Sequence, residues 1–189
     1  MTDISTRDLV ALFGAIAAMI DENKDHLSAL DGVIGDADHG VTMNIGFSAV
    51  TEALAGLDAE VEPTAVFNTA AKSFLNAVGA SSGPLYATAF MRAGAAVKGR
   101  ASLDRDAMVD AWLPGAEAAE AARAADGSLA ACLAAAATAA VEGAESTKAM
   151  LASKGRASRL GERALGHMDP GAKSAALILA VVAEHFAAD

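Results

Sequence analysis

Three aspartates lie close together in the segment DGVIGDADHG, which begins at residue 31. Asp31, Asp36 and Asp38 have no lysine or arginine among them to balance their charge. Carboxylates that lie near one another repel, so they either stay apart in solvent or hold a cation between them. The segment therefore indicates either a solvated loop, with Asp38 as the N-cap of the next helix, or a metal site.

The residue types favour a particular kind of metal. Ligation by carboxylates alone suits a hard cation, Mg²⁺ or Ca²⁺. An EF-hand would close with a glutamate where Phe47 stands when counting starts at Asp36. Mg²⁺ takes few carboxylates and completes its shell with water and substrate phosphates, so a metal here predicts a phosphate ligand. His39 is then a candidate donor to phosphate, a metal ligand or an ordinary helix-start residue.

Two other glycine-containing segments are typical of helix starts. They are Ser81-Ser82-Gly83-Pro84 and Asp169-Pro170-Gly171. Free N–H groups and the positive end of the helix dipole make a helix N-terminus an anion site. Ordinary capping explains either segment alone. They would bind phosphate together only if both met the aspartate segment at one end of the protein.

The charge distribution excludes one class of partner. The formal net charge is −10, whereas nucleic-acid surfaces are rich in lysine and arginine, so we expect no nucleic-acid partner. The main cationic cluster consists of Lys154, Arg156, Arg159, Arg163 and His167. These side chains contact either a phosphate or nucleobase, or solvent and surface acids; for Lys154 and Arg159 we favour solvent.

The remaining composition predicts a cytoplasmic protein without a membrane partner. Cys132 is the single cysteine, so no intrachain disulfide can form. The N-terminus lacks the pattern of a signal peptide. The longest apolar run, LAACLAAAATAAV, is shorter than the ~20 residues of a membrane span.

The elements that must position these residues are predicted to be helices. Apolar residues recur at three- and four-residue spacing, and no segment shows convincing strand alternation. The expected helices are 6–23 with Thr6 as N-cap, 40–55, 63–78, one capped by Ser82 that ends near 97, 107–124, 128–153, and 170–187. The sequence thus predicts one all-α domain over residues 1–189, an antiparallel bundle in which the aspartates lie in the first connection.

Three motifs occur in a particular order along almost the whole chain. They are GDADHG with an upstream aspartate, GASSGPLYATAF and KGRASRLGERALGHMDPGA. Together they resemble the nucleotide-binding subunits of dihydroxyacetone kinases, the DhaL type. Related fatty-acid kinases have threonine after the last aspartate, whereas this chain has His39. The resemblance is therefore to the dihydroxyacetone subunit.

The resemblance implies a site and its partners. It implies an antiparallel helical barrel in which Asp31, Asp36 and Asp38 hold two Mg²⁺ ions that bridge the phosphates of ADP or ATP. A partner subunit would bind dihydroxyacetone, and a phosphohistidine-bearing phosphotransferase subunit would rephosphorylate the ADP. The nucleotide contacts that it implies are His39, Gly40, Val41, Thr42, Ser81, Ser82, Gly99, Met108, Arg156, Asp169, Pro170 and Gly171.

The chain departs from the family pattern between Arg92 and Met108. The family has a further helix there, so we expect a barrel of seven helices in place of eight, with a looser cover over the nucleotide base. Three functions stay open. The chain is a dihydroxyacetone kinase subunit, a kinase subunit for another short ketose such as a tetrose, or a non-catalytic nucleotide-binding module.

Overall fold

The protein is helical throughout the part that the computed structural model describes, which is residues 4–58, 60–79, 82–99, 125, 128–151 and 157–187. This confirms the all-α prediction. The predicted helix 107–124 lies outside these residues, so the number of helices in the barrel stays a prediction. The α-helices are α1 (Thr6–Ile34), α2 (His39–Ala55), α3 (Pro63–Ala77), α4 (Ser82–Ala96), α7 (Leu129–Ser146) and α8 (Pro170–His185); the 3₁₀ helices are η1 (Thr147–Ala149) and η2 (Ala157–Ala164).

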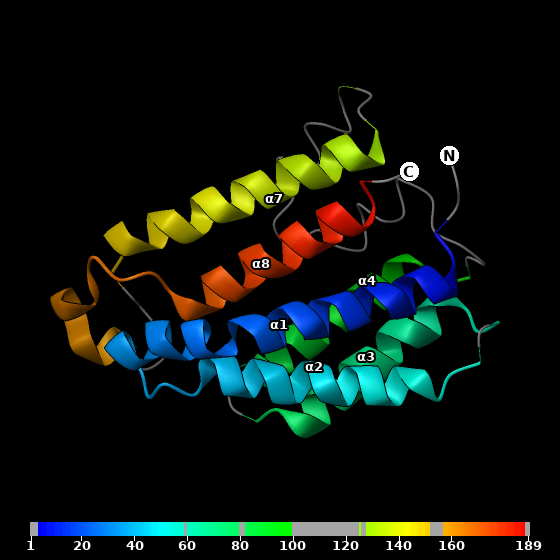
Figure 1. The fold of residues 1–189 in the computed structure, drawn as a ribbon, viewed down its shortest axis with the longest axis horizontal. Helices are drawn as coiled ribbons and strands as arrows, with labels where there is room; N and C mark the ends of the chain where they lie inside the picture. Colours follow the sequence, from blue (N-terminus) through cyan, green and yellow to red (C-terminus); the bar gives the residue numbers. More distant parts are fainter. Residues whose placement is uncertain are drawn as a thin grey trace.

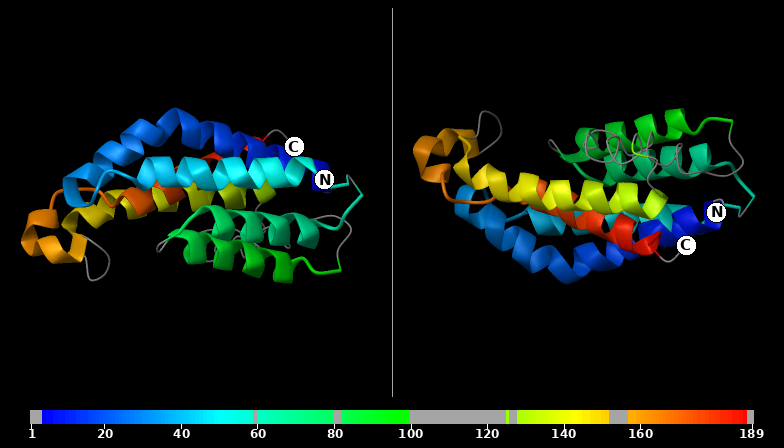
Figure 2. Two further views of the ribbon diagram at one scale, coloured as in Figure 1. Left: turned by 90° about the horizontal axis from the view of Figure 1, so that it is seen from below. Right: turned by 90° about the horizontal axis from the view of Figure 1, so that it is seen from above.

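The helices pack as neighbours in the order α7, α8, α1, α2, α3, α4. Helices α1, α2, α7 and α8 lie along the long axis of the molecule, and the short α1–α2 connection makes that pair antiparallel (Figure 1). Helices α3 and α4 form a pair on the other side of α2 (Figure 2). The end of α1 and the beginnings of α2 and α8 therefore meet at one end of the molecule, on the left of Figure 1.

The N-cap of α1 lies one residue before the predicted cap. Ser5 is the N-cap and forms a capping box with Asp8. Thr6, the predicted cap, is instead a buried first helical residue, and its hydroxyl donates to the carbonyl oxygen of Val61 at 2.6 Å. The Thr6 hydroxyl thus ties the start of α1 to the segment before α3.

Helix α1 also ends eleven residues later than the predicted end at residue 23, because it runs to Ile34. Ile20, Leu27 and Ile34 continue its buried face at seven-residue spacing. Charged residues crowd the segment DENKDH between them and interrupt the apolar pattern. The prediction that all three aspartates lie in a loop is therefore wrong, since Asp31 belongs to the last turn of α1.

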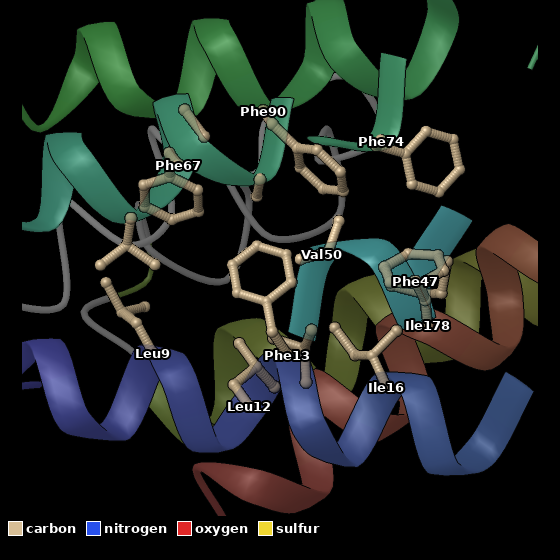
Figure 3. Close-up of a cluster of buried hydrophobic side chains, with 14 of the residues drawn as sticks. Leu9, Leu12, Phe13, Ile16, Phe47, Val50, Phe67, Phe74, Phe90 and Ile178 are labelled. Carbon is tan, nitrogen blue, oxygen red and sulfur yellow. The ribbon is translucent and has the colours of Figure 1, made fainter. Parts of the chain in front are cut away.

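Phenylalanine rings fill the centre of the helical core (Figure 3). Phe13 of α1 meets Phe90 of α4 edge-on, with 5.4 Å between ring centroids. Phe47 of α2 meets Phe74 of α3 in the same way at 5.3 Å. Edge-to-face pairs add to the free energy gained from burying the rings. The few aromatic residues of the chain thus lock α1, α2, α3 and α4 together.

The later helices follow the predicted pattern with changed ends. Helix α7 ends at Ser146, short of the predicted residue 153. Helix α4 begins at Ser82, so Ser82 is its first helical residue and not the predicted cap. Asp169 caps α8 as predicted, because its carboxylate accepts the N–H of Ala172 at 2.8 Å.

One described helix has the length and composition of a membrane span. It is Leu129–Ala149, which comprises α7 and η1, and 22% of the 18-residue window that meets these criteria is buried inside the protein. Its apolar character comes mainly from alanine, and α7 packs against α8. A single helix that meets this test is weak evidence for a membrane span.

Candidate functional site

A pocket of about 820 Å³ opens at the end of the molecule where α2, α4 and α8 begin. Three helix N-termini therefore converge on one cavity, which is the condition that joint phosphate binding requires. Each contributes the positive end of its helix dipole, which favours an anion. The predicted site residues that line the pocket are Asp31, Asp36, Asp38, His39, Thr42, Ser82, Asp169, Pro170 and Gly171.

The three aspartates form a compact group at the edge of this pocket. One ligand oxygen from each of Asp31, Asp36 and Asp38 lies within 4.8 Å of the others. Asp36 and Asp38 are exposed, whereas Asp31 is half-buried. Three carboxylate oxygens at this spacing fit a hard divalent cation such as Mg²⁺. The donor set therefore fits the predicted metal.

Hydrogen bonds from the start of α2 fix the position of Asp31. Its Oδ2 atom accepts the N–H of Asp38 at 2.9 Å and that of His39 at 3.3 Å. Asp38 holds the N-cap position of α2, but its side chain makes no capping hydrogen bond. The cap of α2 therefore comes from α1. The reading of Asp38 as an ordinary N-cap is wrong for its side chain.

The connection between α1 and α2 turns through two unusual positions. Ala37 has φ 63°, in the left-handed region that L-residues other than glycine rarely adopt. At Gly35 an added Cβ would lie 2.1 Å from Oδ1 of Asp31. Gly35 therefore leaves the space in which that carboxylate oxygen sits.

Gly40 allows the first turn of α2 to lie against α1. A Cβ at this buried position would come within 1.8 Å of the carbonyl oxygen of Lys24 and 2.8 Å of the Ser28 hydroxyl. The sequence suggested Gly40 as a nucleotide contact, and this assignment stays a prediction. What the structure adds is a packing reason for glycine here, since a larger residue would push α2 away from α1.

Two backbone contacts hold the start of α8. The N–H of Asp169 donates to the hydroxyl of Thr147 at 3.0 Å, and the N–H of Gly166 donates to the carbonyl oxygen of Lys148 at 2.7 Å. Thr147 and Lys148 immediately follow α7. These two hydrogen bonds join the two ends of the α7–α8 connection, so the connection is closed at its base. This closure places Asp169 at the pocket.

Below the pocket, three side chains from three helices meet. The Ser174 hydroxyl lies 3.1 Å from Nε2 of His39 and 3.2 Å from the Tyr86 hydroxyl. Burial lowers the pKa of His39, and the nearby charges of Asp31, Asp169 and Asp38 oppose that shift. Burial likewise raises the pKa of the Tyr86 phenol.

Sequence reasoning missed this junction of Ser174, Tyr86 and His39. Ser174 shares the buried face of α8 with Ile178 and Val182, at four-residue spacing. A serine in such an apolar row was the available signal. Tyr86 is partly buried against the hydrophobic core and also lines the pocket.

Other predicted residues do not line the pocket. Gly40 and Val41 belong to the first turn of α2, and Val41 is exposed. Gly99, with φ 78°, follows the far end of α4. A helix of 15 residues is ~22 Å long at 1.5 Å per residue, so Gly99 lies well away from Ser82.

The remaining predicted residues divide into two groups. Arg159, Arg163 and His167 are exposed, as the solvent reading of Arg159 predicted. The structural model does not describe four residues, and their roles stay predictions: Ser81, Met108, Lys154 and Arg156.

Comparison with known proteins identifies relatives that match most of the chain. The model of the DAK2 domain family matches residues 33–107 and 99–184. The chain is 35% identical to "PEP-dependent dihydroxyacetone kinase 2, ADP-binding subunit DhaL" of Listeria innocua, over 93% of this chain and 94% of that protein. It is 37% identical to "PEP-dependent dihydroxyacetone kinase, ADP-binding subunit DhaL" of Escherichia coli K12, over 84% of this chain and 87% of that protein.

The fold also matches part of a larger solved structure. The dihydroxyacetone kinase from C. freundii, in complex with AMP-PNP and Mg²⁺, superposes with a TM-score of 0.67 at 24% identity. The match covers 97% of this chain and 35% of that chain. The DhaL-like all-α fold predicted from the sequence is therefore confirmed.

Proposed function

The chain belongs to the DAK2 domain family, and on this premise we propose that it is the nucleotide-binding subunit of a dihydroxyacetone kinase. It would hold ADP or ATP through two Mg²⁺ ions at Asp31, Asp36 and Asp38, in the cytoplasm. The observation that carries the proposal is the cluster of three aspartate carboxylates beside three converging helix starts.

The site suits phosphoryl transfer because that reaction needs positioning and neutralisation of charge more than covalent help from the protein. Mg²⁺ at the aspartates would neutralise the charge of the phosphate oxygens. The starts of α2, α4 and α8 line the same cavity, and their helix dipoles add positive potential there. Asp31 anchors the start of α2 and thereby keeps that turn in place.

The acceptor is proposed to come from another subunit. The relatives are named ADP-binding subunits of PEP-dependent kinases, which supports a division of labour between nucleotide and substrate. We propose two partners: a subunit that binds dihydroxyacetone, and a phosphohistidine-bearing subunit that rephosphorylates the bound ADP. The donor would then derive from phosphoenolpyruvate.

The nucleotide content of the purified protein tests the metal-bridged site. We expect stoichiometric ADP after gel filtration with Mg²⁺ and its loss after gel filtration with a chelator. An empty protein that binds ATP reversibly would favour a looser site and an ATP donor. Retention of ADP in the chelator would contradict the metal bridge.

Phosphoryl transfer with a purified substrate subunit tests the reaction itself. Dihydroxyacetone and a four-carbon ketose are compared as acceptors, with the phosphohistidine donor or ATP supplied. Transfer to dihydroxyacetone supports the proposal, and transfer to the tetrose alone would assign a different acceptor. Nucleotide binding without transfer to either would indicate a non-catalytic module.

A further inference from the structure

We infer that Ser174 is a positioning residue that holds His39 in its Nε2–H tautomer beneath the pocket. The consequence of this tautomer for a bound phosphate rests on the proposed function. The tautomer itself is a property of the free chain. It can therefore be measured whether or not the chain acts as a kinase subunit.

Ser174 is placed to act on all three helix starts. It lies on α8 and is fully buried. Its hydroxyl contacts Nε2 of His39, the first residue of α2, and the hydroxyl of Tyr86 in α4. The same hydroxyl donates to the carbonyl oxygen of Gly171, in the first turn of α8, at 2.9 Å. One oxygen atom thus joins the N-terminal parts of α2, α4 and α8.

The proton count at this oxygen determines the tautomer. A serine hydroxyl has one hydrogen to donate and two lone pairs that accept. A carbonyl oxygen can only accept, so the contact with Gly171 uses the single hydrogen of Ser174. The other two contacts must then be donated to Ser174. Tyr86 gives its O–H, and His39 gives an N–H from Nε2.

The opposite tautomer would leave an unfavourable contact. If Nε2 of His39 were the acceptor, the hydrogen of Ser174 would turn toward it. The oxygens of Ser174 and Gly171 would then face each other at 2.9 Å without a hydrogen between them. A buried polar contact without its hydrogen is costly, and Ser174 is fully buried.

The assigned tautomer restricts what the His39 ring can bind. With hydrogen on Nε2, the neutral imidazole carries its lone pair on Nδ1. A partner of Nδ1 must therefore donate a hydrogen or be a metal ion. A phosphate oxygen without a proton cannot do so, whereas a metal-bound water can. Through Nδ1, the neutral ring of His39 would thus bind the metal or orient water of the metal shell, and it would not contact the phosphate directly.

Long-range ¹H–¹⁵N NMR of the imidazole nitrogens tests the tautomer in the wild-type chain. The spectrum is recorded without nucleotide, above the pH range in which an ordinary histidine titrates. His39→Gln identifies the His39 signals among the four histidines. We expect the protonated-nitrogen signal at Nε2 and the lone-pair signal at Nδ1. The reverse pattern would overturn the inference without touching the proposed kinase function.

Variants at the hydroxyl test whether Ser174 is the cause. We expect Ser174→Ala to give mixed His39 tautomers and Ser174→Thr to restore the wild-type pattern. Ser73→Ala is the matched control, since Ser73 also donates to its own helix, to the carbonyl oxygen of Thr69 at 2.7 Å. An unchanged tautomer in Ser174→Ala would contradict the positioning role.

Tyr86→Phe keeps the ring and removes only the second donor. We expect it to retain the Nε2–H tautomer, because the contacts of Ser174 with Gly171 and His39 remain. A switch of His39 to the Nδ1–H tautomer in this variant would contradict the proton count. Tyr86→Phe therefore tests the proton count even if Ser174→Ala fails to fold.

Discussion

Asp31 and Asp38 are joined by a hydrogen bond in which the Asp38 N–H donates to the Asp31 carboxylate at 2.9 Å. Asp31 lies in the last turn of α1, and Asp38 immediately precedes α2. The Asp31 carboxylate therefore has two roles: it belongs to the proposed metal site, and it caps α2, the helix that follows Asp36 and Asp38. As a result, Asp31 and Asp36 are expected to respond differently to mutation.

We expect Asp36→Ala to abolish metal-dependent nucleotide binding with little change in folding. Asp36 is exposed, so its truncation removes a charge without opening the core. Asp31→Ala should lose the same binding and also about 1 kcal/mol of stability, because two N–H groups lose their acceptor. Calorimetric titration and thermal unfolding measure the two effects. Undiminished binding by Asp36→Ala would contradict the metal assignment.

Gly40→Ala should destabilise the fold through the contact between α1 and α2. The added Cβ would lie 1.8 Å from the Lys24 carbonyl oxygen, which is backbone and cannot turn aside. Overpacking of this kind costs about 1–3 kcal/mol. Gly14→Ala is the control, because nothing lies within 4 Å of its added Cβ and it is helical too.

Denaturant unfolding compares these two glycine variants. Gly14→Ala should be neutral or more stable by up to about 1 kcal/mol, since alanine is the better helix former. Equal stability of Gly40→Ala and Gly14→Ala would show that α2 can shift away from α1 at little cost.

The local part of the site could be predicted from sequence. Helix starts and groups of carboxylates are recognised from residues that are neighbours in the sequence. The start of α8, with Asp169 before Pro170, was therefore predicted correctly. The end of α1 was not, because charged residues between Ile20 and Leu27 hide the buried face that continues to Ile34. Asp31 was consequently assigned to a loop.

The junction below the pocket could not be predicted in this way. Ser174 is 135 residues from His39 and 88 residues from Tyr86 in the chain. Local spacing contains no information about contacts at such separation. They result from the packing of α8 against α1 and of α1 against α2, which aligns the helix starts.

The capping box of α1 predicts an acid-dependent contribution to stability. Hydrogen bonds from the Ser5 side chain and backbone lower the pKa of Asp8 below its ordinary value of 3.8. A carboxylate with a lowered pKa stabilises the folded state above its unfolded pKa, and this contribution is lost as the pH falls through the folded pKa.

Ser5→Ala tests this contribution. The loss of a serine N-cap costs about 1 kcal/mol at neutral pH. We expect the difference in stability between wild type and Ser5→Ala to shrink as the pH falls below 3.8, because protonated Asp8 no longer accepts hydrogen bonds as a charged group. Urea unfolding across the acid range measures it. A difference that stays constant with pH would show that Asp8 takes no part in the cap.

Thr147 should control the order of the segment that enters α8. Its hydroxyl accepts the N–H of Asp169 at 3.0 Å, and Asp169 in turn caps α8. Thr147→Val keeps the shape and removes the acceptor, so the Asp169 amide should exchange its hydrogen about fivefold faster, equivalent to about 1 kcal/mol. Thr147→Ser retains the hydroxyl and should exchange like wild type. Hydrogen exchange followed by NMR resolves this amide.

Because Asp169 lines the pocket, nucleotide affinity should fall in Thr147→Val and not in Thr147→Ser. If Thr147→Val leaves the exchange rate unchanged, the closure at the base of the α7–α8 connection does not depend on this hydroxyl.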